Sequence, residues 1–183
     1  NAVILGDAQG RDVYKKKLLR LVEQYRLNKQ VKFVDHCKHM PLAYKISNLV
    51  VSSSIEPEAF GRVSVEAQSM EKLIIASNIG GSNETIINDK TGLLFESGKP
   101  KSLSQKIIEA LKLEVASLLA KVQSYVPGYQ LILGPLFENG RIVIMLKVRG
   151  LGDYLPEYAG NLDIINCAAI AMAEEYAKVV KNE

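Results

Sequence analysis

The first 112 residues alternate short apolar runs with segments of helical periodicity, and no other feature constrains the fold as strongly. The runs Ala2–Leu5 and Leu73–Ala76 are apolar throughout, which is typical of strands that are covered on both faces. The segment Val13–Tyr25 places its apolar residues at helical spacing. Strands joined by helices favour an α/β fold in which a Rossmann-like parallel sheet carries helices on both faces.

The expected elements of this first part follow one another regularly. In such a sheet a ligand binds at the carboxyl ends of the strands, so the loops that follow the strands are the places to look for a site. The expected strands are Ala2–Leu5, Val31–Val34, Leu49–Ser52, Leu73–Ser77 and Gly92–Phe95, and the expected helices are Val13–Tyr25, Pro41–Ser47, Arg62–Met70, Ser82–Ile87 and Leu103–Leu111.

The character of the sequence changes near Leu113, which predicts two domains, 1–112 and 113–183. The second part is expected to form an antiparallel β-hairpin followed by a C-terminal helix, because Asn139-Gly140 is a strong tight-turn signal between two β-rich runs. Asn161 or Asp163 is the expected cap of the last helix. The expected elements are the helix Val115–Val122, the strands Tyr129–Leu133 and Arg141–Val148, and the helix Leu162–Val180.

Five consecutive apolar residues, 142–146, interrupt the alternation of the second expected hairpin strand. This pattern indicates burial on both faces, because an uncovered apolar strand invites association. We therefore expect the hairpin either to dock on the first part or to form a homodimer.

Composition excludes several classes of protein. The chain is 48% hydrophobic and 23% charged, and it has no apolar run near the about 18 residues of a transmembrane segment. His36-Cys37-Lys38-His39 is not completed by further ligands, so no metal is expected. Cys37 and Cys167 are expected to be reduced thiols in a cytoplasmic protein.

The formal net charge is +3. The run Lys15–Lys17 is interpreted as a solvated helix face, with an anion or nucleic-acid patch as the alternative. Basic residues do not interleave with aromatic ones, so no nucleic-acid partner is expected.

The segment Glu58–Glu66 carries the clearest candidate site. Seven residues separate the two glutamates, and an expected helix begins between them, at Arg62. Helix N-terminal amides attract phosphate groups, while carboxylates accept hydrogen bonds from sugar hydroxyls. A pair of carboxylates on either side of such a helix start can therefore hold both ends of a nucleotide diphosphate sugar.

Residues 1–112 resemble the C-terminal, donor-binding domain of retaining glycosyltransferases with the GT-B fold. The order and spacing of several stretches carry this resemblance, rather than the glutamate pair alone. These stretches are Gly6-Asp7, Val31–Val34, Glu58–Gly61 with Glu66, Gly80–Glu84 and Thr91–Phe95.

The resemblance implies a role for each matching residue. Glu58 is the implied catalytic residue and contacts hydroxyls of the transferred sugar, and Glu66 accepts hydrogen bonds from the ribose. No cofactor is implied, since the nucleotide sugar is itself the donor substrate. The implied substrate-binding residues are Gly6, Asp35 and His36, of which the last two flank the base, Phe60, the amides of Gly61, Arg62 and Val63 at the diphosphate, and Glu66.

Structural alternatives stay open for these residues. Glu66 is alternatively a surface residue of a helix, Glu58 a cap, and Gly80-Gly81 only a turn. Members of the resembled family also carry an upstream Arg and Lys that neutralise the diphosphate, and an acceptor-binding domain. Neither is found in this sequence, so we expect the chain to be catalytically incomplete on its own.

Residues 115–183 resemble a different family, the C-terminal segment of acylating acetaldehyde dehydrogenases. The likeness rests on Tyr125–Tyr129, Gly152–Pro156 and Tyr158–Ile164. It implies that Asn161 lies beside a nicotinamide cofactor, with loop packing of Tyr154, Tyr158 and Asn161 as the alternative. Cys167 is interpreted as a packing residue rather than a nucleophile.

Three functional readings follow. The first is a nucleotide-sugar-binding module of a glycosyltransferase. The second is an engineered or recombined chimera without activity, joined near Lys112–Val115. The third is a remnant of an acylating aldehyde dehydrogenase, and the missing cysteine nucleophile argues against catalysis by it.

Overall fold

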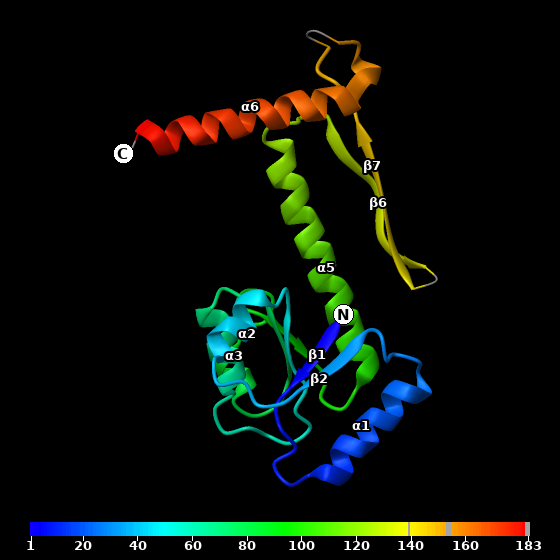
Figure 1. The fold of residues 1–183 in the computed structure, drawn as a ribbon, viewed down its shortest axis with the longest axis vertical. Helices are drawn as coiled ribbons and strands as arrows, with labels where there is room; N and C mark the ends of the chain where they lie inside the picture. Colours follow the sequence, from blue (N-terminus) through cyan, green and yellow to red (C-terminus); the bar gives the residue numbers. More distant parts are fainter. Residues whose placement is uncertain (139, 153–154, 182–183) are drawn as a thin grey trace. The chain divides into compact units, whose positions relative to one another are not determined.

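The computed structural model describes residues 1–138, 140–152 and 155–181 (Figure 1). The chain forms two compact units, Asn1–Gly98 and Lys99–Glu183, which are called unit 1 and unit 2 below. Asn139 of the expected turn and Tyr154 of the expected packing loop lie outside the described residues.

Unit 1 contains parallel strands joined by helices, which confirms the predicted α/β class (Figure 1). The strands form two sheets, a pair with the order β1-β2 and a triplet with the order β3-β4-β5. All the pairings are parallel; Leu5 lies opposite Val34, and Ile75 lies opposite Leu93. The strands are β1 (Ala2–Leu5), β2 (Val31–Val34), β3 (Val50–Ser52), β4 (Ile74–Ser77) and β5 (Leu93–Phe95).

The helices of unit 1 begin within two residues of the predicted positions. Parallel strands require crossover connections, and within each sheet a helix joins successive strands, while one helix leads from the first sheet to the second. They are α1 (Asp12–Gln24), α2 (Met40–Ile46), α3 (Arg62–Ser69) and α4 (Ser82–Thr85).

The core of unit 1 surrounds β4, all of whose residues are buried. Tyr44 of α2 and Ala67 of α3 pack with Ile74, Ala76 and Ile86 in one cluster. The expectation that every apolar strand is covered on both faces is right for β4 and wrong for β1, where Val3 is 60% exposed. The reason is that β4 is the middle strand of a triplet, whereas β1 pairs with β2 alone.

Unit 2 begins with a single long helix where two helical segments were expected. Helix α5 (Pro100–Gln123) runs without a break through Lys112–Val115. No Gly or Pro lies between Pro100 and Pro127, and Lys, Leu and Glu all favour helix, so nothing in the sequence ends the first segment. The other elements of unit 2 are β6 (Tyr129–Glu138), β7 (Arg141–Val148), the 3₁₀ turn η1 (Glu157–Ala159) and α6 (Gly160–Lys181).

The predicted antiparallel hairpin is confirmed, and its first strand is longer than expected. Strand β6 extends to Glu138, which lies opposite Arg141, and the pairing is irregular between Leu131 and Leu136. Pro135 falls in this irregular part, where the ladder tolerates a residue without an N–H. Strand β6 contacts both α5 and β7, so β7 is the outer strand of the hairpin (Figure 1).

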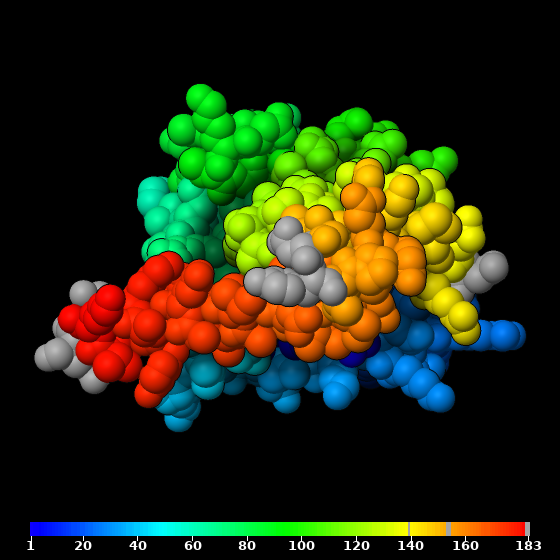
Figure 2. Space-filling view, turned by 90° about the horizontal axis from the view of Figure 1, so that it is seen from above, coloured from blue at the N-terminus to red at the C-terminus, as the bar shows by residue number. Residues whose placement is uncertain are grey.

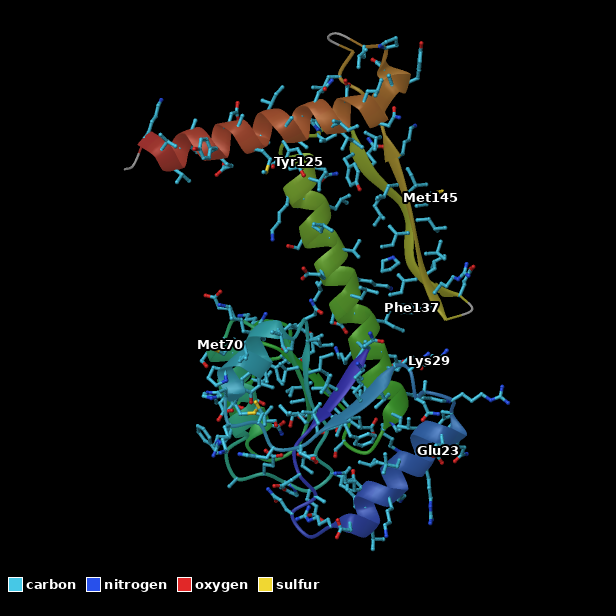
Figure 3. The ribbon with its side chains drawn as sticks, viewed as in Figure 1. Glu23, Lys29, Met70, Tyr125, Phe137 and Met145 are labelled. Carbon is cyan, nitrogen blue, oxygen red and sulfur yellow. The ribbon has the colours of Figure 1, made fainter. Side chains whose placement is uncertain are left out.

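Within unit 2, residues 142–146 are not buried. All five are exposed, for example Ile142 at 52% and Met145 at 52%. Figure 3 labels Phe137 on β6 and Met145 on β7, with side chains along both strands. A two-stranded sheet beside one helix leaves most of its surface uncovered.

Helix α6 begins at Gly160, two residues before the expected start. Asp163 does not cap it, because its Oδ2 accepts a hydrogen bond from the Leu151 N–H of the preceding loop at 2.8 Å. Most residues of helix α6, orange to red in Figure 2, are exposed, among them Asn161 in its first turn. Among the described residues, no helix is both long and apolar enough to cross a membrane.

Candidate functional site

The loop after β3 leads into α3, and Gly61 forms the junction. Gly61 is the N-cap of α3 and has φ +69°, in the left-handed region. Glycine adopts this conformation without steric cost, because it has no Cβ. The chain can therefore turn sharply into α3 and present the helix N-terminus, which carries a partial positive charge.

The turn Gly80-Gly81 holds this loop in place. The Gly81 N–H donates to the Glu58 carbonyl at 2.8 Å. A Cβ on Gly81 would lie 2.5 Å from the Phe60 carbonyl carbon, and one on Gly80 would lie 2.6 Å from the Glu58 carbonyl oxygen. These two glycines are therefore more than a turn, since only residues without side chains let the two segments approach so closely.

Glu58 lies in this loop, and its side chain is half-buried. Its Oε1 accepts a hydrogen bond from the Ser54 hydroxyl, in the same loop. The carbonyl of Ser54 accepts in turn from the Ser97 hydroxyl at 3.2 Å. The Glu58 carboxylate is thus oriented by a chain of hydrogen bonds rather than left free, and it does not cap α3.

Glu66 lies on α3, and both of its carboxylate oxygens have partners. The Tyr44 hydroxyl donates to Oε2 at 2.8 Å, and Arg62 Nε donates to Oε1 at 2.9 Å. The hydrogen bond from Tyr44, followed by that from Arg62, lowers the pKa of Glu66 below its ordinary value, despite an opposing effect of burial. Burial, aided by the bond to Glu66, raises the pKa of Tyr44 to about 12. The Glu66 carboxylate therefore stays ionised and Tyr44 stays a donor at neutral pH.

Gly6 and the residues predicted to flank the base, Asp35 and His36, follow the ends of β1 and β2. The Gly6 N–H donates to the Val34 carbonyl at 2.9 Å, so Gly6 and Asp35 are brought together where the two parallel strands end. Asp35 also forms an ion pair with Lys15 at 3.1 Å, and His36 follows it in an exposed position. These residues form a second group, separate in the sheet topology from the loop that carries Glu58.

The other predicted residues occupy different environments. Phe60 is 60% exposed, the Arg62 side chain is 81% exposed, and Val63 packs against the core cluster. Tyr44 was not predicted as a site residue. A signal was present, because a tyrosine in a core-facing position must find a partner for its hydroxyl.

The described residues contain no group of three or more His, Cys, Asp or Glu side chains that could hold a metal ion. Cys37 and Cys167 are both free. The location of the chain in the cytoplasm stays a prediction.

The chain is similar to solved structures over different shares of its length. Anabaena HepE, solved in complex with UDP-glucose, is 30% identical over 63% of this chain and 32% of that chain, with a TM-score of 0.61. A glycosyltransferase from Rickettsia africae is 26% identical over 99% of this chain and 40% of that chain, also with a TM-score of 0.61. The chain thus spans about a third to two fifths of these solved proteins.

Curated relatives match a shorter segment and have a different name. Acetaldehyde dehydrogenase from Spirochaeta aurantia is 64% identical over 77 residues, which is 41% of this chain and 26% of that protein. Acetaldehyde dehydrogenase from Burkholderia pseudomallei is 62% identical over 65 residues, or 36% of this chain and 22% of that protein. The chain spans about a quarter of the length of these relatives, and both predicted resemblances are confirmed.

The chain also matches the model of a protein family. The model of the glycosyl transferases of group 1 matches residues 1–126, more than half of the chain. This region includes all of unit 1, with the loop, the glycine turn and the carboxylates described above. The chain therefore belongs to the group 1 glycosyl transferase family.

Proposed function

We propose that unit 1 binds a nucleotide sugar, with its diphosphate at the N-terminus of α3. The observation that carries this proposal is the fixed loop between Glu58 and Glu66. Its backbone is locked against Gly80-Gly81, and it places an ionised or hydrogen-bonded carboxylate on each side of the helix start. In this arrangement the positive N-terminus of α3 lies between two carboxylates. It matches a ligand that has phosphates in the middle and hydroxyl-bearing groups at both ends.

Each group has a distinct proposed task. The amides near Gly61, Arg62 and Val63 bind phosphate oxygens, and the exposed Arg62 side chain adds a positive charge there. Glu58 is the proposed catalytic residue, which accepts hydrogen bonds from the transferred sugar. Glu66 accepts them from the ribose. Gly6, Asp35, His36 and Phe60 are proposed to line the remainder of the donor site, and the donor needs no further cofactor.

The complex of HepE with UDP-glucose supports this proposal by similarity. Transfer of the sugar to an acceptor belongs to whole proteins of which this chain spans about a third. We therefore propose donor binding for these residues, and transfer only together with an acceptor-binding partner or domain. In that reaction the protein would supply positioning and stabilisation of the leaving diphosphate.

Calorimetric titration with UDP, GDP, ADP and NAD tests the proposal. We expect one nucleoside diphosphate to bind, and Glu66→Ala to abolish or strongly weaken that binding. The matched control is Glu23→Ala, an exposed glutamate on α1 (Figure 3). Glu58→Gln should weaken the nucleotide sugar but not the free diphosphate. Failure of all three diphosphates to bind would refute the proposed function.

A second candidate rests on the 64% identity to acetaldehyde dehydrogenase. We propose that the chain is a chimera of domains 1–112 and 113–183, whose second part is a dehydrogenase remnant. Asn161 would then be the residue near a nicotinamide cofactor. Weak NAD binding that is lost in Asn161→Ala supports the remnant, whereas no binding to any ligand supports a chimera without activity.

We also propose a homodimer through the hairpin. The exposed apolar residues 142–146 lie on the outer strand β7, and a second copy of the same strand would cover them. Light scattering should report a dimer for the wild type and a monomer for Ile144→Lys, with Lys147→Ala as the control. A monomeric wild type at high concentration would refute this proposal.

A further inference from the structure

Tyr44 connects the core of unit 1 to the candidate site. Tyr44 is 5% exposed and belongs to the core cluster with Ala67 and Ile74. Its hydroxyl reaches from α2 to α3 and donates to Oε2 of Glu66 at 2.8 Å. One side chain thus has its ring fixed by packing and its polar end bonded to a carboxylate of the proposed site.

The two partners of Glu66 differ in how easily a ligand can replace them. Arg62, which holds Oε1, has a side chain that is 81% exposed, and the Glu66 side chain is 34% exposed. An ion pair that is this open to solvent contributes little to stability, so a competing anion can readily replace the carboxylate. The bond to Oε2 comes from a buried ring, so moving it would disturb the core.

The protonation states suit this division of roles. Burial raises the pKa of Tyr44, so its hydroxyl remains a donor, while the pKa of Glu66 is lowered, so the carboxylate remains an acceptor. Oε2 is occupied by the protein at neutral pH. Oε1, by contrast, is held only by the exposed Arg62 side chain.

We propose that Tyr44 is a positioning residue that fixes Glu66 by its Oε2, so that Oε1 is directed to the ribose hydroxyls when Arg62 is drawn to the diphosphate. This inference rests on the proposed function. Arg62 then exchanges one ion-pair partner for another: it neutralises Glu66 in the free protein and the phosphate in the complex. Tyr44 itself does not touch the ligand.

The variant Tyr44→Phe keeps the ring in the core and removes only the hydroxyl. Calorimetry compares the best-binding diphosphate among UDP, GDP and ADP with its 2′,3′-dideoxy analogue. We expect about tenfold weaker binding of the ribonucleotide, the loss typical of one hydrogen bond to a charged group, and unchanged binding of the analogue. An equal loss for both ligands, or no loss for either, overturns the proposal. Tyr14→Phe on the exposed face of α1 is the control.

A measurement without ligand separates this inference from the proposed function. The carbon-13 NMR shift of the Glu66 carboxyl group, followed through an acid titration, should show a higher pKa in Tyr44→Phe than in the wild type. An unchanged pKa overturns the positioning role even if nucleotides bind. If the pKa rises but no diphosphate binds to the wild type, the proposed function fails, and the role of Tyr44 toward a ribose fails with it.

Discussion

Unit 1 and unit 2 contain equally apolar strands but differ in what they bury. Every residue of β4 in unit 1 is buried, whereas every residue of β7 in unit 2 is exposed except the half-buried Val148. Of the ten buried hydrophobic residues among those described, eight lie in unit 1 and two, Ala110 and Val126, lie in unit 2. Apolar sequence alone therefore does not decide burial.

The number of strands and helices packed around a strand decides whether its side chains are buried. Strand β4 has a strand on each side and helices packed on the triplet, so its side chains meet protein on both faces. Strand β7 has β6 on one edge and nothing paired on the other among the described strands. A hairpin of this kind is marginally stable on its own.

The largest expected effect compares two isoleucines, one in each unit. Ile74→Ala should lower the free energy of unfolding by about 2–5 kcal/mol, because Ile74 is fully buried and its truncation leaves a cavity. Ile144→Ala should change it by less than about 0.5 kcal/mol in the monomer, because Ile144 is 39% exposed. Urea unfolding of the full chain at low concentration measures both. Equal losses would break the comparison between the units.

The next effect tests the close approach of two segments in unit 1. Gly81→Ala should cost about 1–3 kcal/mol, because the new Cβ would lie 2.5 Å from the Phe60 backbone. The same variant should weaken nucleotide binding, since the loop that carries Glu58 must move. Asn83→Ala, at an exposed position of α4, is the control. Thermal unfolding and calorimetry check the two results, and an unaffected Gly81→Ala would show that the loop tolerates displacement.

The strands of unit 1 and the hairpin were predictable because their signals are local. Uniform apolar runs predict the strands of unit 1, and the two β-rich runs on either side of Asn139-Gly140 predict the hairpin. Glu58 and Glu66 were found through the resemblance to glycosyltransferases, and their roles stay predictions. The continuity of α5 was missed because two apolar segments were interpreted separately, although no residue between them ends a helix.

Long-range features could not be predicted in the same way. The bond between Tyr44 and Glu66 joins residues 22 positions apart, and periodicity says nothing of which helix faces which. The exposure of β1 depends on its single neighbour in the sheet, and the exposure of β7 on the absence of a covering layer among the described elements. Such features come from packing between elements.

A smaller effect of opposite sign concerns buried hydroxyls. Ser64 is fully buried in α3, and its Oγ has no hydrogen-bond partner among the described residues. Ser64→Ala should therefore raise the free energy of unfolding by about 1 kcal/mol, since it removes an unpaired buried polar atom. In unit 2, the exposed Ser124 hydroxyl donates to the Lys121 carbonyl at 2.7 Å, so Ser124→Ala should be neutral or slightly destabilising. Urea unfolding compares the two, and a loss in Ser64→Ala would reveal a partner that forms in solution.

The smallest effect is the pH dependence that Glu66 confers on unit 1. Its pKa is lower in the folded protein than the ordinary value of 4.5, chiefly because of the Tyr44 hydrogen bond. The stability it contributes is therefore present above about pH 4.5 and is lost as the pH falls through the folded value. Its side chain is about one third exposed, so the contribution should be under about 1 kcal/mol.

The test is the difference in unfolding free energy between the wild type and Glu66→Gln, measured from about pH 6 to about pH 3. This difference should shrink as the pH falls. The difference between Tyr44→Phe and the double variant Tyr44→Phe with Glu66→Gln should hardly vary with pH, because Tyr44→Phe already lacks the hydrogen bond that chiefly lowers the pKa of Glu66. Glu23→Gln corrects for the loss of one exposed carboxylate on α1. A difference between wild type and Glu66→Gln that does not vary with pH would mean that water replaces the Tyr44 hydroxyl at Glu66 in solution. The Glu66 carboxylate would then be held as loosely as the exposed ion pair between Arg149 and Glu157 in unit 2.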